Sequence, residues 1–120
     1  MISAPAVPAK NTKSVAENKT MEYHKLVRDN IPDIIKAKGE VAVTHVANDT
    51  EYAQKLREKL EEEVAEYLHD ESISEIADIL EVIDAIAEYK GFEYKEIVAV
   101  KQEKAEKRGR FAKRIILDES

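Results

Sequence analysis

The sequence predicts a mainly helical protein with four helices and one short pair of strands. Glycine and proline, which break helices, are scarce, with three of each in 120 residues. Apolar residues recur at helical spacing over several long segments. Two shorter stretches, Val41–Val46 and Arg114–Leu117, are apolar and β-branched in the manner of strands.

The length favours a single domain. Residues 1–20 are Ala, Pro, Asn, Ser, Thr and Lys without periodicity, and we expect them to form a flexible tail. Residues 21–120 should form the folded domain, and Met21 is a plausible start of the natural chain. The opening MISAPAVPAK lacks the basic and apolar regions of a secretory signal. No apolar run is long enough to span a membrane, so we expect a cytoplasmic protein with no membrane partner.

The charge of the chain limits its partners. The formal net charge is −6, and the positive balance of the first twenty residues makes the remainder still more acidic. An acidic body argues against binding to a nucleic acid polymer, which relies on basic surface. A small phosphorylated ligand remains compatible with it, because a bound divalent cation reverses the local sign. The absence of cysteine excludes disulfides and thiolate metal sites.

The first helix is expected to begin near Pro32, since proline is favoured at a first helical position. Asn30 is a candidate cap, and Gly39 should end the helix. The alternating residues Val41–Val46 then form the first predicted strand.

The second helix should run to about Leu68 and start at one of three capping residues, Asn48, Asp49 or Thr50. A third helix follows the turn HDES and reaches about Lys90, before Gly91. The fourth is expected over Tyr94–Lys107. The chain then ends in a loop and the strand Arg114–Leu117, which can pair with the first strand.

Acidic residues are dense where the second helix ends and the third begins. Glu63 and Glu66 are three residues apart, as are Glu75 and Asp78, so each pair shares a helix face. The short connection makes the two helices antiparallel neighbours. The two pairs then lie at equal depth, and four carboxylates outline a box between the helices.

Four carboxylates this close require either raised pKa values or a cation. Oxygen ligands suit Mg²⁺, Mn²⁺ or Ca²⁺, and such centres serve phosphate chemistry by activating water. Two simpler interpretations stay open. Glu75 can complete a capping box with Ser72, and Glu61, Glu62 and Glu71 can form a solvated face.

Three blocks of the chain resemble one known family. EEEVAE (Glu61–Glu66) followed by SEIAD (Ser74–Asp78) is similar to the EExxE…ExxD signature of the all-α nucleoside triphosphate pyrophosphohydrolases, which include MazG. YHKLVRDNIP (Tyr23–Pro32) and EKAEKRGRFAKRIIL (Glu103–Leu117) resemble the opening and ending of its phosphoribosyl-ATP pyrophosphohydrolase-like branch.

The resemblance implies a MazG-like helical bundle that assembles as a homodimer or homotetramer. It also implies cleavage of a nucleoside triphosphate between the α- and β-phosphates, giving a nucleoside monophosphate and pyrophosphate, as in house-cleaning of the nucleotide pool. Mg²⁺, or Mn²⁺ in its place, would be held by Glu63, Glu66, Glu75 and Asp78. Either Glu62 or Glu63 would orient the attacking water or accept its proton.

A triphosphate also needs cationic contacts besides the metal. The candidates are Lys25, Arg28, Lys107, Arg108 and Arg114. Arg28 is the first choice, and a surface ion pair is the alternative for each. Two other functions remain open: hydrolysis of phosphoribosyl-ATP in histidine synthesis, and a non-catalytic helical module that binds a partner or a nucleotide.

Overall fold

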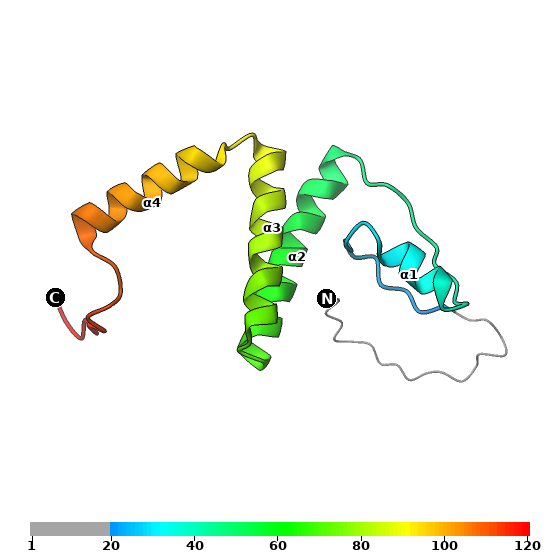
Figure 1. Ribbon diagram of the computed structural model, residues 1–120, viewed down its shortest axis with the longest axis horizontal. Helices are drawn as coiled ribbons and strands as arrows, with labels where there is room; N and C mark the ends of the chain where they lie inside the picture. Colours follow the sequence, from blue (N-terminus) through cyan, green and yellow to red (C-terminus); the bar gives the residue numbers. More distant parts are fainter. Residues whose placement is uncertain (1–19) are drawn as a thin grey trace. The chain divides into compact units, whose positions relative to one another are not determined.

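The structure, a computed structural model, describes residues 20–120, which form four helices (Figure 1). They are α1 (Ile31–Ala37), α2 (Asp49–His69), α3 (Ile73–Lys90) and α4 (Tyr94–Arg108). The prediction of a mainly helical chain is therefore confirmed. The predicted tail lies outside the described residues, apart from Thr20.

The predicted strand pair is wrong, because residues 20–120 contain no strand. Alternation and β-branching make a segment suitable for a sheet, but a strand is stable only when a neighbour completes its hydrogen bonds. Neither Val41–Val46 nor Arg114–Leu117 has such a neighbour, and Val43, Val46 and Ile115 are exposed.

The chain divides into two compact units. The first extends to Ile86 and contains α1, α2 and most of α3. The second begins at Ala87 and contains the end of α3, α4 and the C-terminal segment. The packing of all four helices into one bundle remains a prediction.

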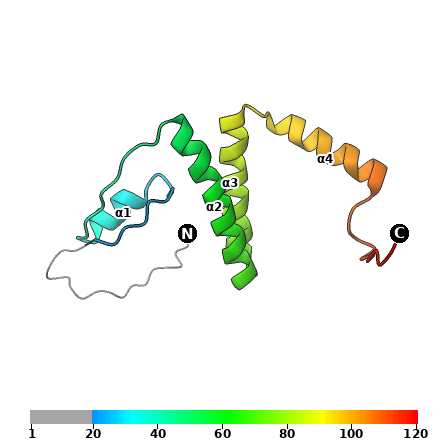
Figure 2. The ribbon, with the colours of Figure 1, turned by 180° about the vertical axis from the view of Figure 1, so that it is seen from behind.

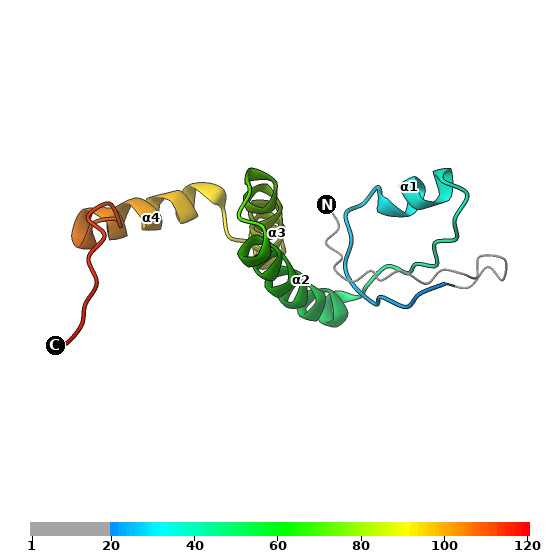
Figure 3. The same ribbon diagram turned by 90° about the horizontal axis from the view of Figure 1, so that it is seen from below.

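The first unit is organised around a hairpin of α2 and α3, which lie side by side in all three views (Figures 1, 2 and 3). The helix α2 begins where Asn48 Oδ1 accepts a hydrogen bond from the Glu51 N–H, at 2.9 Å. At its other end the Asp70 N–H donates to the Glu66 carbonyl. Residues 70–72 connect the two helices, which is short enough to make them the predicted antiparallel neighbours.

The interior of this hairpin is unusually polar. Within residues 20–120 the buried hydrophobic side chains are Leu56 and Val82. The buried polar and charged side chains outnumber them: Lys59, Glu63, Glu75 and Asp78. The hairpin therefore encloses an ionic cluster, which is the candidate metal site.

None of the four helices within residues 20–120 combines the length and the apolar composition needed to cross a bilayer.

Candidate metal centre

Three carboxylates converge between α2 and α3. Glu63 comes from α2, and Glu75 and Asp78 come from α3, three residues apart on one face. Each offers one oxygen atom, and these oxygen atoms all lie within 4.8 Å of one another. All three side chains are buried, so the group is enclosed and is not part of a solvated acidic face.

Two oxygen atoms of the cluster have no hydrogen-bond donor. They are Oε1 of Glu63 and Oε1 of Glu75, both inaccessible to solvent. Glu63 is 1% exposed and Glu75 is 5% exposed. A buried carboxylate without a donor or cation carries a large desolvation cost. A divalent cation bound to these oxygens would remove that cost, and hard oxygen ligands suit Mg²⁺ or Mn²⁺.

The titration of the cluster reflects its enclosure. Burial raises the pKa of Glu63, and the hydrogen bond from Lys59 opposes that rise. Burial also raises the pKa of Glu75, and the nearby charges of Asp78, Glu66 and Glu63 raise it further.

Glu66, the fourth predicted ligand, is placed differently. It is half-buried and lies outside the group of three converging acids. Its charge nevertheless acts on Glu75, so it lies near the cluster. The capping interpretation of Glu75 applies to its backbone: the Glu75 N–H donates to Ser72 Oγ at 3.4 Å. Its carboxylate faces the cluster, so capping and metal binding use different atoms of one residue.

Cations surround the carboxylates. Arg28 Nη2 lies 2.8 Å from Asp78 Oδ1, and Lys25 Nζ lies 3.0 Å from Glu62 Oε2. Lys59 Nζ lies 3.4 Å from Glu62 Oε1 and 3.2 Å from Glu63 Oε2. Glu62, one of the two residues predicted to orient the water or accept its proton, therefore contacts two lysines.

Sequence reasoning missed Lys59. The signal that identifies it is its spacing, because it precedes Glu62 by three residues and Glu63 by four on the same helix. Because that face of α2 is buried, the ion pairs of Lys59 belong to the site and are not surface salt bridges.

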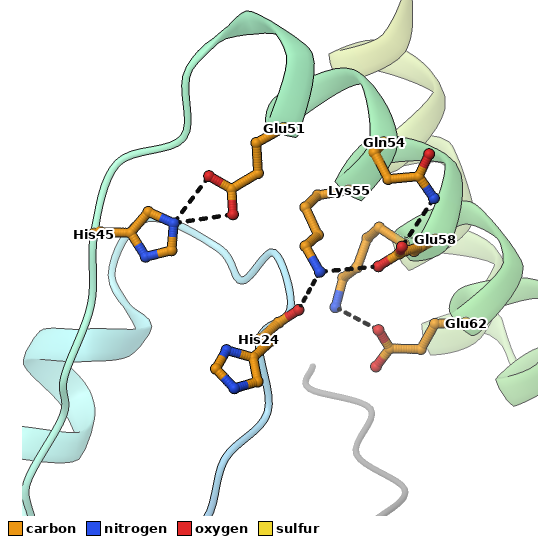
Figure 4. A network of polar contacts seen from close by, with 8 residues as sticks. His24, His45, Glu51, Gln54, Lys55, Glu58 and Glu62 are labelled. Carbon is orange, nitrogen blue, oxygen red and sulfur yellow. Dashed lines mark hydrogen bonds and ion pairs between the residues drawn. The ribbon is translucent and has the colours of Figure 1, made fainter.

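The segment carrying Lys25 and Arg28 is tied to α2. Lys55 Nζ donates to the His24 carbonyl at 2.6 Å and lies 3.2 Å from Glu58 Oε1 (Figure 4). His24 has a φ of 49°, an uncommon backbone conformation for a residue other than glycine. These contacts hold the two basic residues beside the acidic cluster.

The other predicted phosphate contacts lie in the second unit. Lys107, Arg108 and Arg114 are exposed there. Lys107 Nζ forms an ion pair with Glu103 at 3.1 Å, within one turn of α4. Within the first unit, Lys25 and Arg28 are the predicted basic residues that pair with carboxylates.

The comparisons with known proteins cover part of the chain. A segment of 41 residues, 34% of the chain, is 51% identical to part of an uncharacterized protein of Mycolicibacterium smegmatis. The match spans 42% of that relative, less than half of its length. No protein-family profile and no solved structure matches the chain. The similarity therefore indicates shared ancestry over this segment and carries no activity with it.

Proposed function

We propose that this chain is a Mg²⁺-dependent nucleoside triphosphate pyrophosphohydrolase that releases pyrophosphate and a nucleoside monophosphate. The observation that supports this most is the enclosed group of Glu63, Glu75 and Asp78. Two buried carboxylate oxygens in it lack hydrogen-bond donors, which favours a bound cation over a purely structural cluster. The similarity of the acidic blocks to the pyrophosphohydrolase signature supplies the reaction class.

The ligands would be Glu63, Glu75 and Asp78, with Glu66 at the edge of the site. When bound, the ion would polarise a phosphoryl oxygen and lower the pKa of a water molecule. The work of the protein is to keep the three carboxylates in place by packing α2 against α3 and to exclude bulk water from them. An enclosed site strengthens each electrostatic contact within it.

Glu62 and Glu63 are the two candidates to orient a water molecule, and their contacts differ. Both Glu62 oxygens are in contact with lysine ammonium groups. Glu63 gives one oxygen to Lys59, while the other is enclosed without a donor, and burial raises the pKa of the group. With one oxygen on Lys59 and the other available to the ion, Glu63 can orient a water molecule but has no oxygen left to accept its proton.

Arg28 is suited to contact the substrate. Its side chain is 46% exposed while its guanidinium is anchored on Asp78. A guanidinium has five donors, so it can hold a carboxylate and still donate to a phosphate oxygen. Lys25, held beside Glu62, would add a second positive charge near the cluster.

The test is hydrolysis by the full chain with Mg²⁺, using a panel of ribo- and deoxyribonucleoside triphosphates together with phosphoribosyl-ATP. We expect pyrophosphate and a monophosphate as products, and release of orthophosphate would place cleavage at the wrong bond. Glu63→Gln and Asp78→Asn should abolish turnover while the helical circular dichroism is kept. Turnover that persists in both variants would contradict the proposal, and turnover of phosphoribosyl-ATP alone would reassign the substrate.

A further inference from the structure

Lys59 is the buried cation of this site. It is 9% exposed, and no other lysine or arginine within residues 20–120 is buried. Its ammonium group lies against Glu62 and Glu63, at the edge of the acidic cluster that Glu63 belongs to. Enclosing an ammonium group is costly unless it is paired, so a surface salt bridge is a poor account of this residue.

Lys59 occupies one of the two oxygens with which Glu63 could bind metal ions. Oε2 of Glu63 is 3.2 Å from the ammonium group, whereas Oε1 is enclosed without a hydrogen-bond partner. Centres that hold two divalent ions keep them about 3.5–4 Å apart, a spacing that both oxygens of one carboxylate can bridge. Here Glu63 can offer one oxygen to an ion while the other stays with Lys59.

The charges around the cluster also favour a single divalent ion. The carboxylates that are buried or half-buried around it are Glu62, Glu63, Glu66, Glu75 and Asp78. Among residues 20–120, the cations paired with these carboxylates are Lys25, Arg28 and Lys59. In the part of the chain that the structure describes, five negative and three positive charges leave an excess of two, which one divalent ion neutralises. A second ion would leave an enclosed region with two uncompensated positive charges.

We propose that Lys59 takes the place of a second divalent cation and restricts the centre to one ion per chain. The inference rests on the metal site of the proposed function. In this chain, the ammonium group of Lys59 occupies the position where a second ion would otherwise bind Glu63. Lys59 is accordingly a positioning residue, which acts through Glu63.

The experiment is a titration of the full chain with Mn²⁺. Calorimetry counts the bound ions, and electron paramagnetic resonance shows whether they are isolated or coupled. The wild-type protein should bind one Mn²⁺ per chain and give the spectrum of an isolated ion. Lys59→Gln and Lys59→Met, which remove the charge, should each bind two and give the spectrum of a coupled pair. Lys59→Arg keeps the charge and should bind one.

Arg57→Gln is the matched control, because Arg57 is an exposed cation on the same helix, two residues before Lys59. It should bind one Mn²⁺. Two ions in the wild type, or a single ion in folded Lys59→Gln and Lys59→Met, would overturn the role of Lys59 and leave the metal site standing. A wild-type protein that binds no Mn²⁺ would overturn the proposed function as well. Should Lys59→Gln fail to fold, Lys59→Met and the wild-type count decide the question.

Discussion

Glu63 and Glu75 combine features that an acidic residue rarely shows together. Each is almost completely enclosed, and each has an oxygen without a hydrogen-bond donor. A folded protein tolerates this arrangement when the position serves a ligand, since apolar residues of similar size would pack at lower cost. The two residues are therefore the most informative positions in the chain.

Removing one carboxylate of the centre should weaken metal binding strongly. Substitution of groups that only orient a ligand costs about 10–100-fold in metal affinity, so Glu75→Gln or Asp78→Asn should cost more than that. Calorimetry with Mn²⁺ measures the change. Glu81→Gln, at an exposed position of the same helix, is the control and should bind as the wild type does. Equal affinity in Glu75→Gln would exclude Glu75 as a ligand.

The raised pKa of Glu75 predicts how stability depends on pH in the metal-free protein. The folded state binds the proton of Glu75 more tightly than the unfolded state does. Glu75 therefore stabilises the fold at pH values below the ordinary pKa of a glutamate. That contribution is lost as pH rises through the raised pKa. Urea unfolding in a chelator should thus show Glu75→Gln gaining stability relative to the wild type as the pH rises above the ordinary glutamate pKa of 4.5.

Metal should reverse this trend, because ions bind the deprotonated carboxylate. With Mn²⁺ present, the wild type should gain stability over Glu75→Gln as the pH rises. A stability difference that does not change with pH in the chelator would contradict the raised pKa.

At the scale of the helices, α1 and α2 begin in different ways. Asn48 caps α2 through its side chain, whereas Asn30 precedes α1 without a side-chain capping bond. The helix α2 carries Lys59 and Glu63, so the stability of its first turn bears on the site. Proline in the first turn of α1 reduces the number of backbone donors that need a cap.

Asn48→Ala should therefore destabilise the fold by about 1 kcal/mol, the usual cost of removing a capping side chain. Chemical denaturation measures it as a shift in midpoint with an unchanged slope. Asn30→Ala is the matched control and should change the free energy of unfolding little. A larger loss in Asn30→Ala than in Asn48→Ala would contradict the assignment of the two caps.

On the scale of the whole molecule, the chain leaves many large apolar side chains exposed. The hairpin of the first unit presents Val64, Leu68, Ile76, Leu80 and Ile83 to solvent. In the second unit α4 buries none of its residues. A monomeric protein seldom exposes a large apolar patch, and small domains gain stability from association. We propose that the hairpin face is covered by a second copy of the chain.

Leu80→Glu should disrupt this assembly, because it places a charge at an apolar interface. Sedimentation velocity should show a dimer or tetramer for the wild type and a smaller species for the variant. Leu80→Met keeps the face apolar and should sediment as the wild type does. A wild-type chain that sediments as a monomer at every concentration would contradict the proposal.

Much of the local structure could be predicted from the sequence. The expected bounds of all four helices lie within a few residues of those observed, because caps, glycine stops and helical spacing act over a few positions. The convergence of Glu63 with Glu75 and Asp78 also follows from spacing along two antiparallel helices. The prediction of a strand pair was wrong, because a strand requires hydrogen bonds from a neighbouring strand, which its own residues cannot supply.

The chain by itself thus determined which segments are helical and which acids face one another, since both depend on periodicity over short distances. The tertiary structure alone decided which charges are paired and enclosed. Arg28 meets Asp78 across 50 positions of sequence, and packing of α2 against α3 buries Lys59 while leaving Glu66 at the edge. Such outcomes depend on helix rotation and on contacts between distant segments, because desolvation is set by everything that surrounds a charge.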